Sequence, residues 1–526
     1  MAESADPTLR QGSLGVGDIV FFVVSAAAPL LVMAGVAPYA ILKAGLGVPD
    51  AYLFAGVVLA VFAVGFTTMS KYVPNAGAFY AYVTKGMGRP AGVAAALTAL
   101  MSYNALQIGM YGLLGVAAQA TFASLWNIDL PWPLFAFAGI VFVWFLGYKS
   151  VHFGARVLAV FLTAESAILL LLAIAILVKG GASGIRFDSF TPAHALNSDT
   201  GSVLAVAFAA FMGFESTVIY RAEARDPKRA IPRATYIAVG FLALFYGFIV
   251  WTIIQAFGAD KVVAAAAQDP AGLFFTAATQ YLGTWAADTM HVLMISSVLA
   301  SLLAFHNAVN RYTLAIADEG MLPSGLARIH PRTGSPHVAG ILQTVLAAVI
   351  VGGFAIAHAD PYLQLLIWVN TPGVVGLVLL QVMVALSAVI YFRRNKTQDG
   401  IWRTMIAPIL ATAGMVASLY LMITNISLLT GASATVNRVI LLTVPVVVIA
   451  GLAWAAWLRR FRPAVYADRI RRRRGRRRGD DAVPRRRPDW RGRQCQGRLT
   501  RSSSGPASAR WTRPVPPPAR SRSRTG

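Results

Sequence analysis

Cysteine and charged residues are the scarcest features of this sequence. Its one cysteine is Cys495, so a disulfide within the chain and a cysteine-ligated metal site are both excluded. Charged residues make up 13% of the 526 residues, about half of the roughly 25% that is usual in soluble domains. Because 57% of the residues are hydrophobic and the mean hydropathy is +0.61, most of the chain is predicted to face something other than water.

Motifs for metal and nucleotide chemistry are missing as well. The 7 histidines are scattered without metal-ligand spacing, and no Gly-x-x-x-x-Gly-Lys-Ser/Thr sequence is present, which argues against an ATP motor in the chain. A membrane-embedded enzyme acting on lipid-linked substrates would need clustered acids or histidines, which the sequence does not have. The short polar segment before Asp18 lacks a small-residue cleavage site, so no removed signal peptide is predicted.

Apolar runs of about 20 residues recur from end to end, and this is the length that crosses a bilayer as a helix. The runs are continuous and lack the alternation of membrane strands, so we predict an all-α membrane protein. Twelve transmembrane helices are expected, at about residues 18–42, 51–70, 91–122, 132–147, 154–178, 203–221, 234–257, 285–316, 337–358, 362–391, 404–428 and 437–458.

The positive charges support this count. With a cytoplasmic N-terminus, the inside segments carry 17 Lys and Arg and the outside segments carry 5, leaving out the C-terminal tail and Arg311 within a span. This is the asymmetry that the positive-inside rule requires. It predicts a multi-pass protein of the plasma (inner) membrane with both termini in the cytoplasm.

The chain divides into a cytoplasmic N-terminus (1–17), a membrane domain (18–458) and a basic tail (459–526). The tail holds 23 Arg and 4 Asp, which leaves only +5 of the net charge of +24 for the rest of the chain. It is too polar and Pro-rich to form a core, so we predict disorder, with anionic lipid as the one expected contact. Nucleic-acid binding is not expected, because the tail has no aromatic platform or binding motif.

Two spans contain residues that interrupt a helix. The first holds Pro29, Gly35 and Pro38, and the sixth holds Gly213 and the ionisable Glu215. Broken helices are tolerated in a membrane where their backbone groups are buried in protein or line a cavity. Interruptions at matching positions of two halves point to the central site of an inverted-repeat transporter.

Three segments carry recognisable motifs. They are VPNAGAFYAYVTKGMGRPAG (Val73–Gly92), GFESTVIYRAEARDPKRAIPRA (Gly213–Ala234) and NRYTLAIADEGMLP (Asn310–Pro323). In this order they resemble the amino acid–polyamine–organocation permeases over about residues 14–460. The resemblance implies a five-plus-five inverted-repeat (LeuT-like) transporter fold with broken helices 1 and 6. Its repeats would span about 18–178 and 203–391, with extra helices over 404–458.

In such a fold, orphan N–H groups of the broken helices attract an anion and orphan C=O groups attract a cation. The residues that the resemblance and the breaks nominate as substrate contacts are Ala27, Ala28, Pro29, Leu30, Asn104, Gln107, Phe208, Phe211, Gly213, Phe214 and Glu215. The alternatives are helix or lipid packing for Phe208 and Phe211, interhelical hydrogen bonding for the third-span residues, and a capping role for Glu215.

The first break departs from the family pattern. Family members commonly carry Gly-x-Gly where this chain has Pro29, Leu30 and Leu31. Proline supplies no N–H, so one donor for an α-carboxylate is missing. The departure favours an amine or a decarboxylated amino acid as the substrate.

Three polar residues are candidates for ion coupling. Glu165 falls where some family members carry a lysine, and burial favours the neutral acid, so it is a candidate proton carrier. Ser297 and Ser301 match the side of the fold where sodium-coupled relatives place hydroxyl ligands. The alternatives are a structural, hydrogen-bonded acid for Glu165 and close helix packing for the serines. No cofactor is expected, only a coupling ion, which is a proton or, alternatively, sodium.

The predicted function is a secondary transporter that moves amino acids or related amines by alternating access, with proton symport. An exchanger and a sensor that binds without transport are the alternatives. The expected partners are a small-molecule substrate and the lipid bilayer. The PKRAIPR segment (227–233) is interpreted as a cytoplasmic gating loop, and Asn370 and Thr371 beside Pro372 as an interruption of the tenth span.

Overall fold

The computed structural model describes residues 14–73, 78–149, 155–195, 201, 203–215, 217–218 and 224–463. The chain divides into two units, Met1–Arg469 and Ile470–Gly526, and all described residues lie in the first. They are helical throughout, apart from turns and an isolated β-bridge between Leu14 and Ala224. The predictions for the N-terminus before residue 14 and for most of the basic tail fall outside the described residues.

The helices of the N-terminal half are α1 (Val16–Ala27), α2 (Pro29–Gly35), α3 (Ala37–Ala44), η1 (Gly45–Gly47), α4 (Val48–Ser70), α5 (Ala78–Met87), α6 (Arg89–Trp126), α7 (Trp132–Tyr148), α8 (Ala155–Val178), η2 (Asp188–Phe190), α9 (Pro192–Ala195) and α11 (Leu204–Ala210). Those of the C-terminal half are α12 (Pro227–Phe257), α13 (Val262–Gln268), α14 (Leu273–Tyr281), α15 (Thr284–Asp318), η4 (Ser324–Ala327), α16 (His337–Ile356), η5 (Pro361–Leu366), α17 (Ile367–Arg394), η6 (Trp402–Ile406), α18 (Ala407–Thr424), α19 (Ile426–Thr430) and α20 (Ala434–Phe461).

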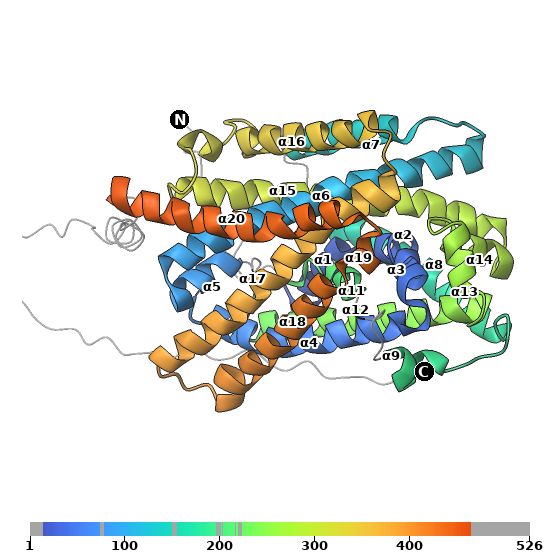
Figure 1. Ribbon diagram of the computed structural model, residues 1–526, viewed down its shortest axis with the longest axis horizontal. Coiled ribbons are helices and arrows are strands. Elements are labelled where there is room, and N and C mark those ends of the chain that lie inside the picture. The colour runs from blue at the N-terminus through green and yellow to red at the C-terminus, as the bar shows by residue number, and fades with distance from the viewer. Residues whose placement is uncertain are drawn as a thin grey trace, which may run out of the picture. The chain divides into compact units, whose positions relative to one another are not determined.

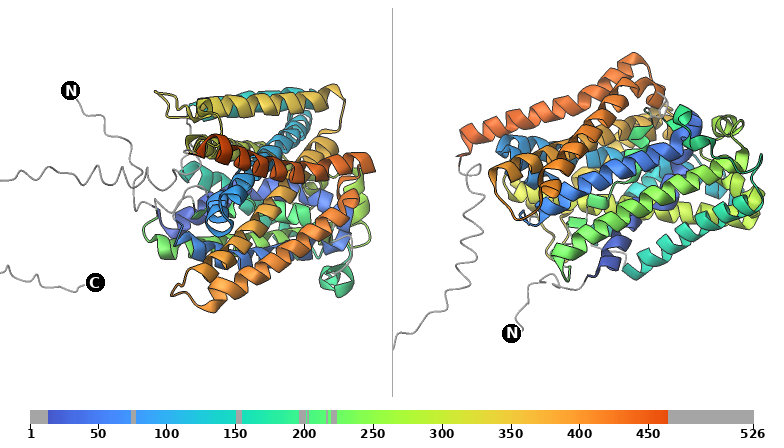
Figure 2. Two further views of the ribbon diagram at one scale, coloured as in Figure 1. Left: turned by 60° about the vertical axis from the view of Figure 1, so that its left-hand side comes forward. Right: turned by 90° about the horizontal axis from the view of Figure 1, so that it is seen from below.

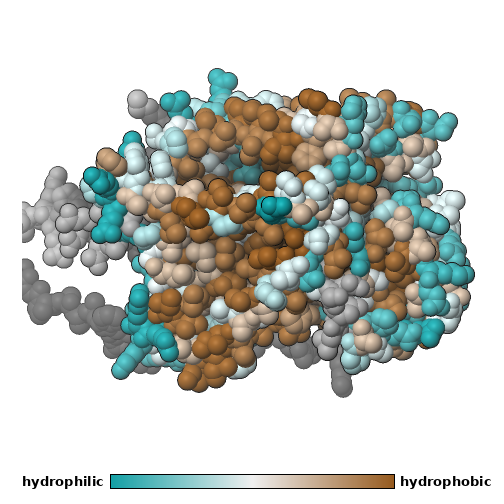
Figure 3. Space-filling view, viewed as in Figure 1, coloured by the Kyte–Doolittle hydropathy of each residue, from teal (hydrophilic) through white to brown (hydrophobic). Residues whose placement is uncertain are grey.

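Ten helical stretches of the described chain are long and apolar enough to cross a membrane, and α7 adds a shorter apolar helix of 17 residues. An all-α, multi-pass membrane protein is therefore confirmed, while the count of twelve spans stays a prediction. The face seen in Figure 3 is hydrophobic across its middle and hydrophilic toward its left and right ends. The long helices run between these two ends in Figure 1, as helices that cross a bilayer would.

The first helix breaks where the sequence predicts. α1 ends at Ala27, and α2 begins at Pro29, where the missing N–H of proline breaks no helical hydrogen bond. Ala28 between them has φ 45° and ψ 77°, in the left-handed region. That conformation costs a non-glycine residue about 1–2 kcal/mol, so the surroundings must hold it in place.

The sixth segment is interrupted as well. α11 ends at Ala210, and the chain then turns through Gly213, whose φ of 106° suits glycine because no Cβ is present to clash. Short 3₁₀ turns follow at 214–215 and 217–218. A continuous helix over 203–221 is therefore not formed among the described residues.

Two expectations about proline are wrong. The PKRAIPR segment is not a loop but the first turns of α12, which starts with Pro227 at its first position, where proline is favoured. α17 also continues through Pro372 without a break, and the Thr371 hydroxyl donates to the Ile367 carbonyl within the helix. In addition, the sequence reading did not anticipate the short helices α5, α13 and α14.

The packing of the long helices surrounds the first break. α4 and α12 lie along one another, and α1 packs against α12, α8 and α15. On the other side, α6 contacts α15, α17, α7 and α20. Figure 1 shows α1 and α2 near the middle of its view, and Figures 1 and 2 show α7 and α16 together at one edge.

The end of the bundle that carries α5 is the predicted cytoplasmic end (left in Figure 1). There the Lys71 Nζ lies 2.7 Å from Asp399 Oδ1, and the Tyr72 hydroxyl donates to Asp399 Oδ2 at 2.7 Å. The backbone N–H of Arg225 donates to the Leu14 carbonyl at 3.0 Å beside the Leu14–Ala224 bridge. This bridge joins the start of α1 to the segment before α12.

Replacing Ala28 by glycine should stabilise the protein by about 1 kcal/mol, because glycine adopts the left-handed conformation without a Cβ clash. Ala27→Gly, one residue earlier and still helical, is the matched control and should destabilise by about 1 kcal/mol. Both are measured by denaturant titration in detergent. Equal losses for the two variants would show that Ala28 is not strained.

Asp399 gives a pH-dependent contribution to stability. Burial alone would raise its pKa, but the hydrogen bonds from Lys71 and Tyr72 and the charges of Lys71 and Arg403 outweigh burial and lower the pKa. The stabilisation is therefore complete above the ordinary value of 3.8 and is lost as the pH falls through the lowered value.

The variant Asp399→Asn should lose about 1 kcal/mol of stability at pH 7, and its difference from the wild type should shrink as the pH falls below about 4. Asp188→Asn, at an exposed ion pair with Arg186, serves as the control and should change stability by less than about 0.5 kcal/mol. A pH-independent difference for Asp399→Asn would contradict the assignment.

Candidate functional site

Glu165 connects three helices at the first break. It lies on α8 and is 4% exposed, and its Oε2 accepts a hydrogen bond of 2.9 Å from the Ser297 hydroxyl of α15. The backbone N–H of Leu30, at the start of α2, also interacts with this carboxylate. The first turn of a helix presents N–H groups without partners in the helix and a positive dipole end, which both favour an anion. Glu165 supplies that anion from within the protein.

Glu215 makes the corresponding connection at the sixth segment. Its Oε2 accepts from the Gly213 N–H at 3.0 Å, and its Oε1 accepts from the Tyr103 hydroxyl of α6 at 2.7 Å. The bond to Gly213 lies within the turn after α11, so capping of a neighbouring helix stays an alternative, while the bond from Tyr103 connects Glu215 to α6. This carboxylate is 5% exposed, so both bonds lie in a dry environment, where they are strong.

The two acids give the centre of the protein a negative character. Among the described residues, the buried charged side chains are Glu165 and Glu215, and neither lysine nor arginine is buried. A buried carboxylate without a counter-ion is costly, so a proton or a cation at either acid would be stabilised. The centre is therefore suited to protons, ammonium groups or metal cations.

The phenylalanines of the sixth segment are packed against other helices. Phe211 meets Tyr246 of α12 edge to face, with ring centroids 6.1 Å apart. Phe214 meets Phe62 of α4 in the same way at 6.0 Å. Phe208 is 3% exposed. Helix packing, the alternative to substrate contact, is thus the arrangement present for Phe211 and Phe214.

The third-span candidates are also held by protein groups. The Asn104 side chain donates to the Leu100 carbonyl of its own helix at 2.7 Å. Gln107 accepts a hydrogen bond from Gln343 of α16 and donates to the Tyr111 hydroxyl at 3.3 Å. Interhelical hydrogen bonding is therefore what Gln107 does here.

The remaining candidates lie at or near the first break. Ala27, Ala28, Pro29 and Leu30 form the break itself, and all of them are buried. Ser301 lies one turn beyond Ser297 on α15 and is buried as well. The structure thus brings Glu165, Ser297 and Leu30 together, while Glu215 is held by Tyr103 of α6.

A column of tyrosines leads from Glu215 toward the predicted cytoplasmic end. The Tyr103 ring is 6.4 Å from Tyr312 of α15, and Tyr312 is 5.5 Å from Tyr80 of α5, measured between centroids. The Tyr80 hydroxyl donates to Glu319 Oε1 at 3.0 Å at the end of α15. Side chains from α5, α6 and α15 therefore meet on that side of the break.

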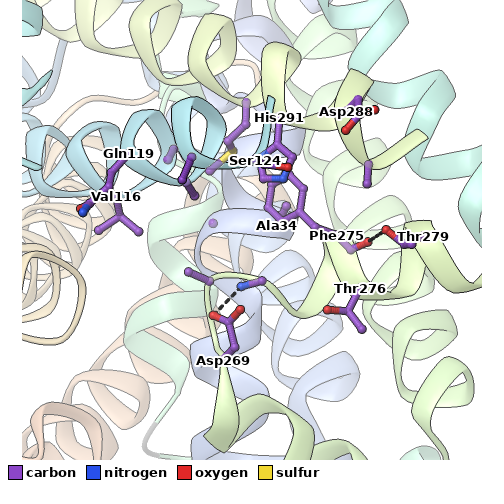
Figure 4. A pocket seen from close by; sticks show the side chains of 18 of the residues that line it. Ala34, Val116, Gln119, Ser124, Asp269, Phe275, Thr276, Thr279, Asp288 and His291 are labelled. Carbon is purple, nitrogen blue, oxygen red and sulfur yellow. Dashed lines mark hydrogen bonds between the residues drawn. The ribbon is translucent and has the colours of Figure 1, made fainter. Parts of the chain in front are cut away.

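A cavity of about 940 Å³ lies toward the opposite end of the bundle. It is bounded by the end of α2, the C-terminal part of α6, α14 and the start of α15, and Ala34 and Gly35 of α2 line it. Figure 4 shows Phe275 and His291 face to face beside it, with centroids 4.1 Å apart. None of the predicted site residues line this cavity.

The charged residues of the cavity wall are acidic. Asp269 and Asp288 line it together with His291, and no lysine or arginine is among its lining residues. Asp269 Oδ1 accepts from the Gly272 N–H at 2.9 Å, as Figure 4 shows. The potential in this cavity therefore favours a cation over an anion.

Sequence reasoning missed several of these residues. Asp269 lies in the connection before α14, and Asp288 and His291 lie in the predicted eighth span, but none of them was singled out as a candidate. Tyr80 and Tyr312 lie inside two of the family motifs, yet nothing in the sequence shows that their rings meet. Tyr246 of α12, whose hydroxyl donates to the Ala27 carbonyl at 3.4 Å, lies in an apolar run and carries no local signal.

Comparison with known proteins agrees with the geometry. The sequence profile described as amino acid permease matches residues 18–466. An uncharacterised transporter of Mycobacterium bovis is 30% identical over 205 residues, which are 38% of this chain and 44% of the relative. The chain therefore matches less than half the length of that relative. The branched-chain amino acid permease BcaP of Lactococcus lactis is 23% identical over 405 residues, covering 72% of this chain and 82% of the relative. A vacuolar cationic amino acid transporter of Arabidopsis thaliana is 26% identical over 146 residues, or 28% of this chain and 24% of the relative.

Removal of the Tyr103 hydroxyl tests the link between α6 and the sixth segment. Tyr103→Phe should cost about 2 kcal/mol of stability, because the buried Glu215 carboxylate loses a charge-assisted donor. The loss should be much smaller when Glu215→Gln is already present, and a double-mutant cycle in detergent measures this coupling. Asn104→Ala, which removes only a bond within α6, is the control. Additive losses for Tyr103 and Glu215 would contradict the link.

Proposed function

The chain belongs to the amino acid permease family, and from this premise we propose that it is a secondary transporter of amino acids or related amines. The proposed fold is the twelve-span, five-plus-five inverted-repeat arrangement. Its broken helices are α1–α2 and the sixth segment around Gly213. Cargo binds between these breaks and crosses by alternating access, as one side of the bundle opens while the other closes.

One observation carries the proposal, namely the Glu165 carboxylate at the start of α2. The hydrogen bond from Ser297 is also what a structural acid would have, but this carboxylate is held by a hydroxyl and lies near a backbone N–H, with no buried lysine or arginine among the described residues. Such a group can take up and release a proton without leaving a buried base unpaired. We therefore assign Glu165 as the proton carrier of a proton-coupled symporter, with Ser297 orienting it.

Three features favour a cargo with an ammonium group. Pro29 offers no N–H to a carboxylate, and Glu165 already interacts with the N–H of Leu30. Glu215 adds a second buried negative charge at the sixth segment. The cavity that reaches Ala34 carries two more carboxylates. We accordingly propose an amine or a decarboxylated amino acid as the preferred cargo, bound as its cation.

The structures at the two ends of the bundle favour one direction of cargo movement, from the outer end to the cytoplasmic end. The acidic cavity lies at the predicted outer end, and the tyrosine column and the Leu14–Ala224 bridge lie at the predicted cytoplasmic end. Cargo would therefore enter along the cavity and leave by parting Tyr103, Tyr312 and Tyr80. The plasma membrane and cytoplasmic termini follow from the positive-inside rule, and the basic tail would then contact anionic lipid.

Uptake into proteoliposomes tests this function. Labelled leucine, isoamylamine and 1,4-diaminobutane are offered with and without an inward pH gradient. We expect the amines to be taken up faster than leucine, and the gradient to accelerate their uptake. Glu165→Gln should bind the same amines but reduce uptake to the rate seen without a gradient, because the amide cannot carry a proton.

Asp288→Asn is the control, since it removes a carboxylate of the cavity wall but leaves Glu165 intact. It should keep the response to the gradient. Uptake that ignores the gradient in the wild type, or an unchanged response in Glu165→Gln, would remove the proton-carrier role. Absence of uptake of every compound by a folded wild-type protein would reject the transporter itself.

A further inference from the structure

Tyr246 of α12 lies at both breaks at once. Its hydroxyl donates to the carbonyl of Ala27, the last residue of α1, at 3.4 Å. The edge-to-face contact of its ring with Phe211 reaches the end of α11, and the side chain is fully buried. A single aromatic ring therefore contacts both breaks.

The bond to Ala27 satisfies an acceptor that the break creates. Carbonyls in the last turn of a helix have no partner in that helix and carry the negative end of its dipole. These carbonyl groups attract cations. A neutral hydrogen-bond donor, such as the hydroxyl of a tyrosine, can bind them in place of a cation. Tyr246 therefore supplies a donor to the unpaired carbonyl at the end of α1, and Glu165 supplies an acceptor to the unpaired N–H at the start of α2. Both helix ends at the first break are thus paired with side chains of the protein.

The hydrogen bond from Tyr246 is a weak one. Its length of 3.4 Å exceeds the 2.7–2.8 Å that is usual for an O–H···O bond. An ammonium group bonds a carbonyl at about 2.7–2.9 Å and roughly twice as strongly, because the bond is charge-assisted. Glu165 lies within electrostatic range of Tyr246 and would favour the same cation. An ammonium group is therefore expected to bind the Ala27 carbonyl more strongly than the Tyr246 hydroxyl does.

We propose that Tyr246 is a positioning residue that holds the Ala27 carbonyl in the empty carrier and yields it to the ammonium group of the cargo. This inference rests on the proposed function and adds a residue to it. The displaced ring presses on Phe211, so occupation of the first break is communicated to the sixth segment. No covalent step is involved, only an exchange of one hydrogen-bond donor for another.

The structure provides a matched control in Tyr52 of α4. Its ring packs edge to face on that of Tyr246 at 5.7 Å and it is equally buried. Its hydroxyl has no hydrogen-bond partner among the described residues. Tyr52→Phe therefore removes the same atom from the same aromatic cluster without touching the break.

The experiment measures binding of isoamylamine and 1,4-diaminobutane by thermal shift and by titration calorimetry in detergent. Tyr246→Phe leaves the Ala27 carbonyl without its donor in the empty protein, so the empty protein should melt earlier. The amine no longer has to displace a hydroxyl, so its Kd should fall by about two- to threefold, which corresponds to the roughly 0.5 kcal/mol of one weak competing bond. Tyr52→Phe should leave Kd unchanged.

The sign of the change in amine affinity in Tyr246→Phe distinguishes a positioning residue from a merely structural one. A merely structural tyrosine would lower stability and leave Kd unchanged or raise it, and either result with Tyr246→Phe overturns the inference. A wild type that binds amines while Tyr246→Phe binds no tighter rejects only the role of Tyr246. A wild type that binds no amine rejects the proposed cargo and this inference together.

A second measurement covers the case in which Tyr246→Phe does not fold. Difference infrared spectra of the wild type and of Tyr52→Phe are recorded with and without 1,4-diaminobutane. Displacement of the phenol predicts a shifted tyrosine band on amine binding in both proteins. The absence of a tyrosine band, or its loss in Tyr52→Phe, overturns the inference.

Discussion

A helix that stops inside a bilayer leaves backbone groups for which neither the helix nor the lipid has a partner, and this constraint organises the centre of the protein. Every such group must be met by another part of the chain or by a ligand. At the first break the N–H side is met by Glu165, and the carbonyl side is met by Tyr246. At the sixth segment Glu215 meets the N–H of Gly213.

These contacts come from helices that are far apart in the sequence, and they connect the two breaks to α6, α8, α12 and α15. Glu165 reaches across to α15, Glu215 to α6 and Tyr246 to α1. Each connection is one side chain and one hydrogen bond, worth about 1–3 kcal/mol. That is strong enough to define a resting arrangement and weak enough for a bound cation or a proton to change it. Binding of a cation or a proton at the centre is therefore large enough in energy to change these contacts.

The sequence could predict the parts of the site that depend on local chemistry. Pro29 and Gly213 mark the interruptions because proline lacks a donor and glycine tolerates positive φ, and Glu165 stands out as an acid in an apolar run. The partners could not be predicted in the same way. Ser297 is 132 residues from Glu165, and Tyr246 is 219 residues from Ala27. A tyrosine in an apolar helix gives no sign that its hydroxyl ends at a broken helix.

The incorrect expectations have a similar origin. The PKRAIPR segment suggests a loop from its prolines, yet proline is also favoured in the first turn of a helix, and Pro227 starts α12. Pro372 predicts an interruption, but α17 continues through it, and the Thr371 hydroxyl donates to the Ile367 carbonyl. In both places local chemistry allowed two outcomes, and long-range packing selected between them. The all-α, multi-pass character was secure because it depends on hydrophobic length alone.

The bridge between Leu14 and Ala224 has a mechanical consequence. It fastens the entrance of α1 to the stretch that precedes α12, and α1 also packs along α12. An outward movement of α1 alone would break this bridge. We therefore expect α1 and α12 to move together. For a transporter of the kind proposed, this coupling predicts that the cytoplasmic side opens by a joint tilt of α1 and α12.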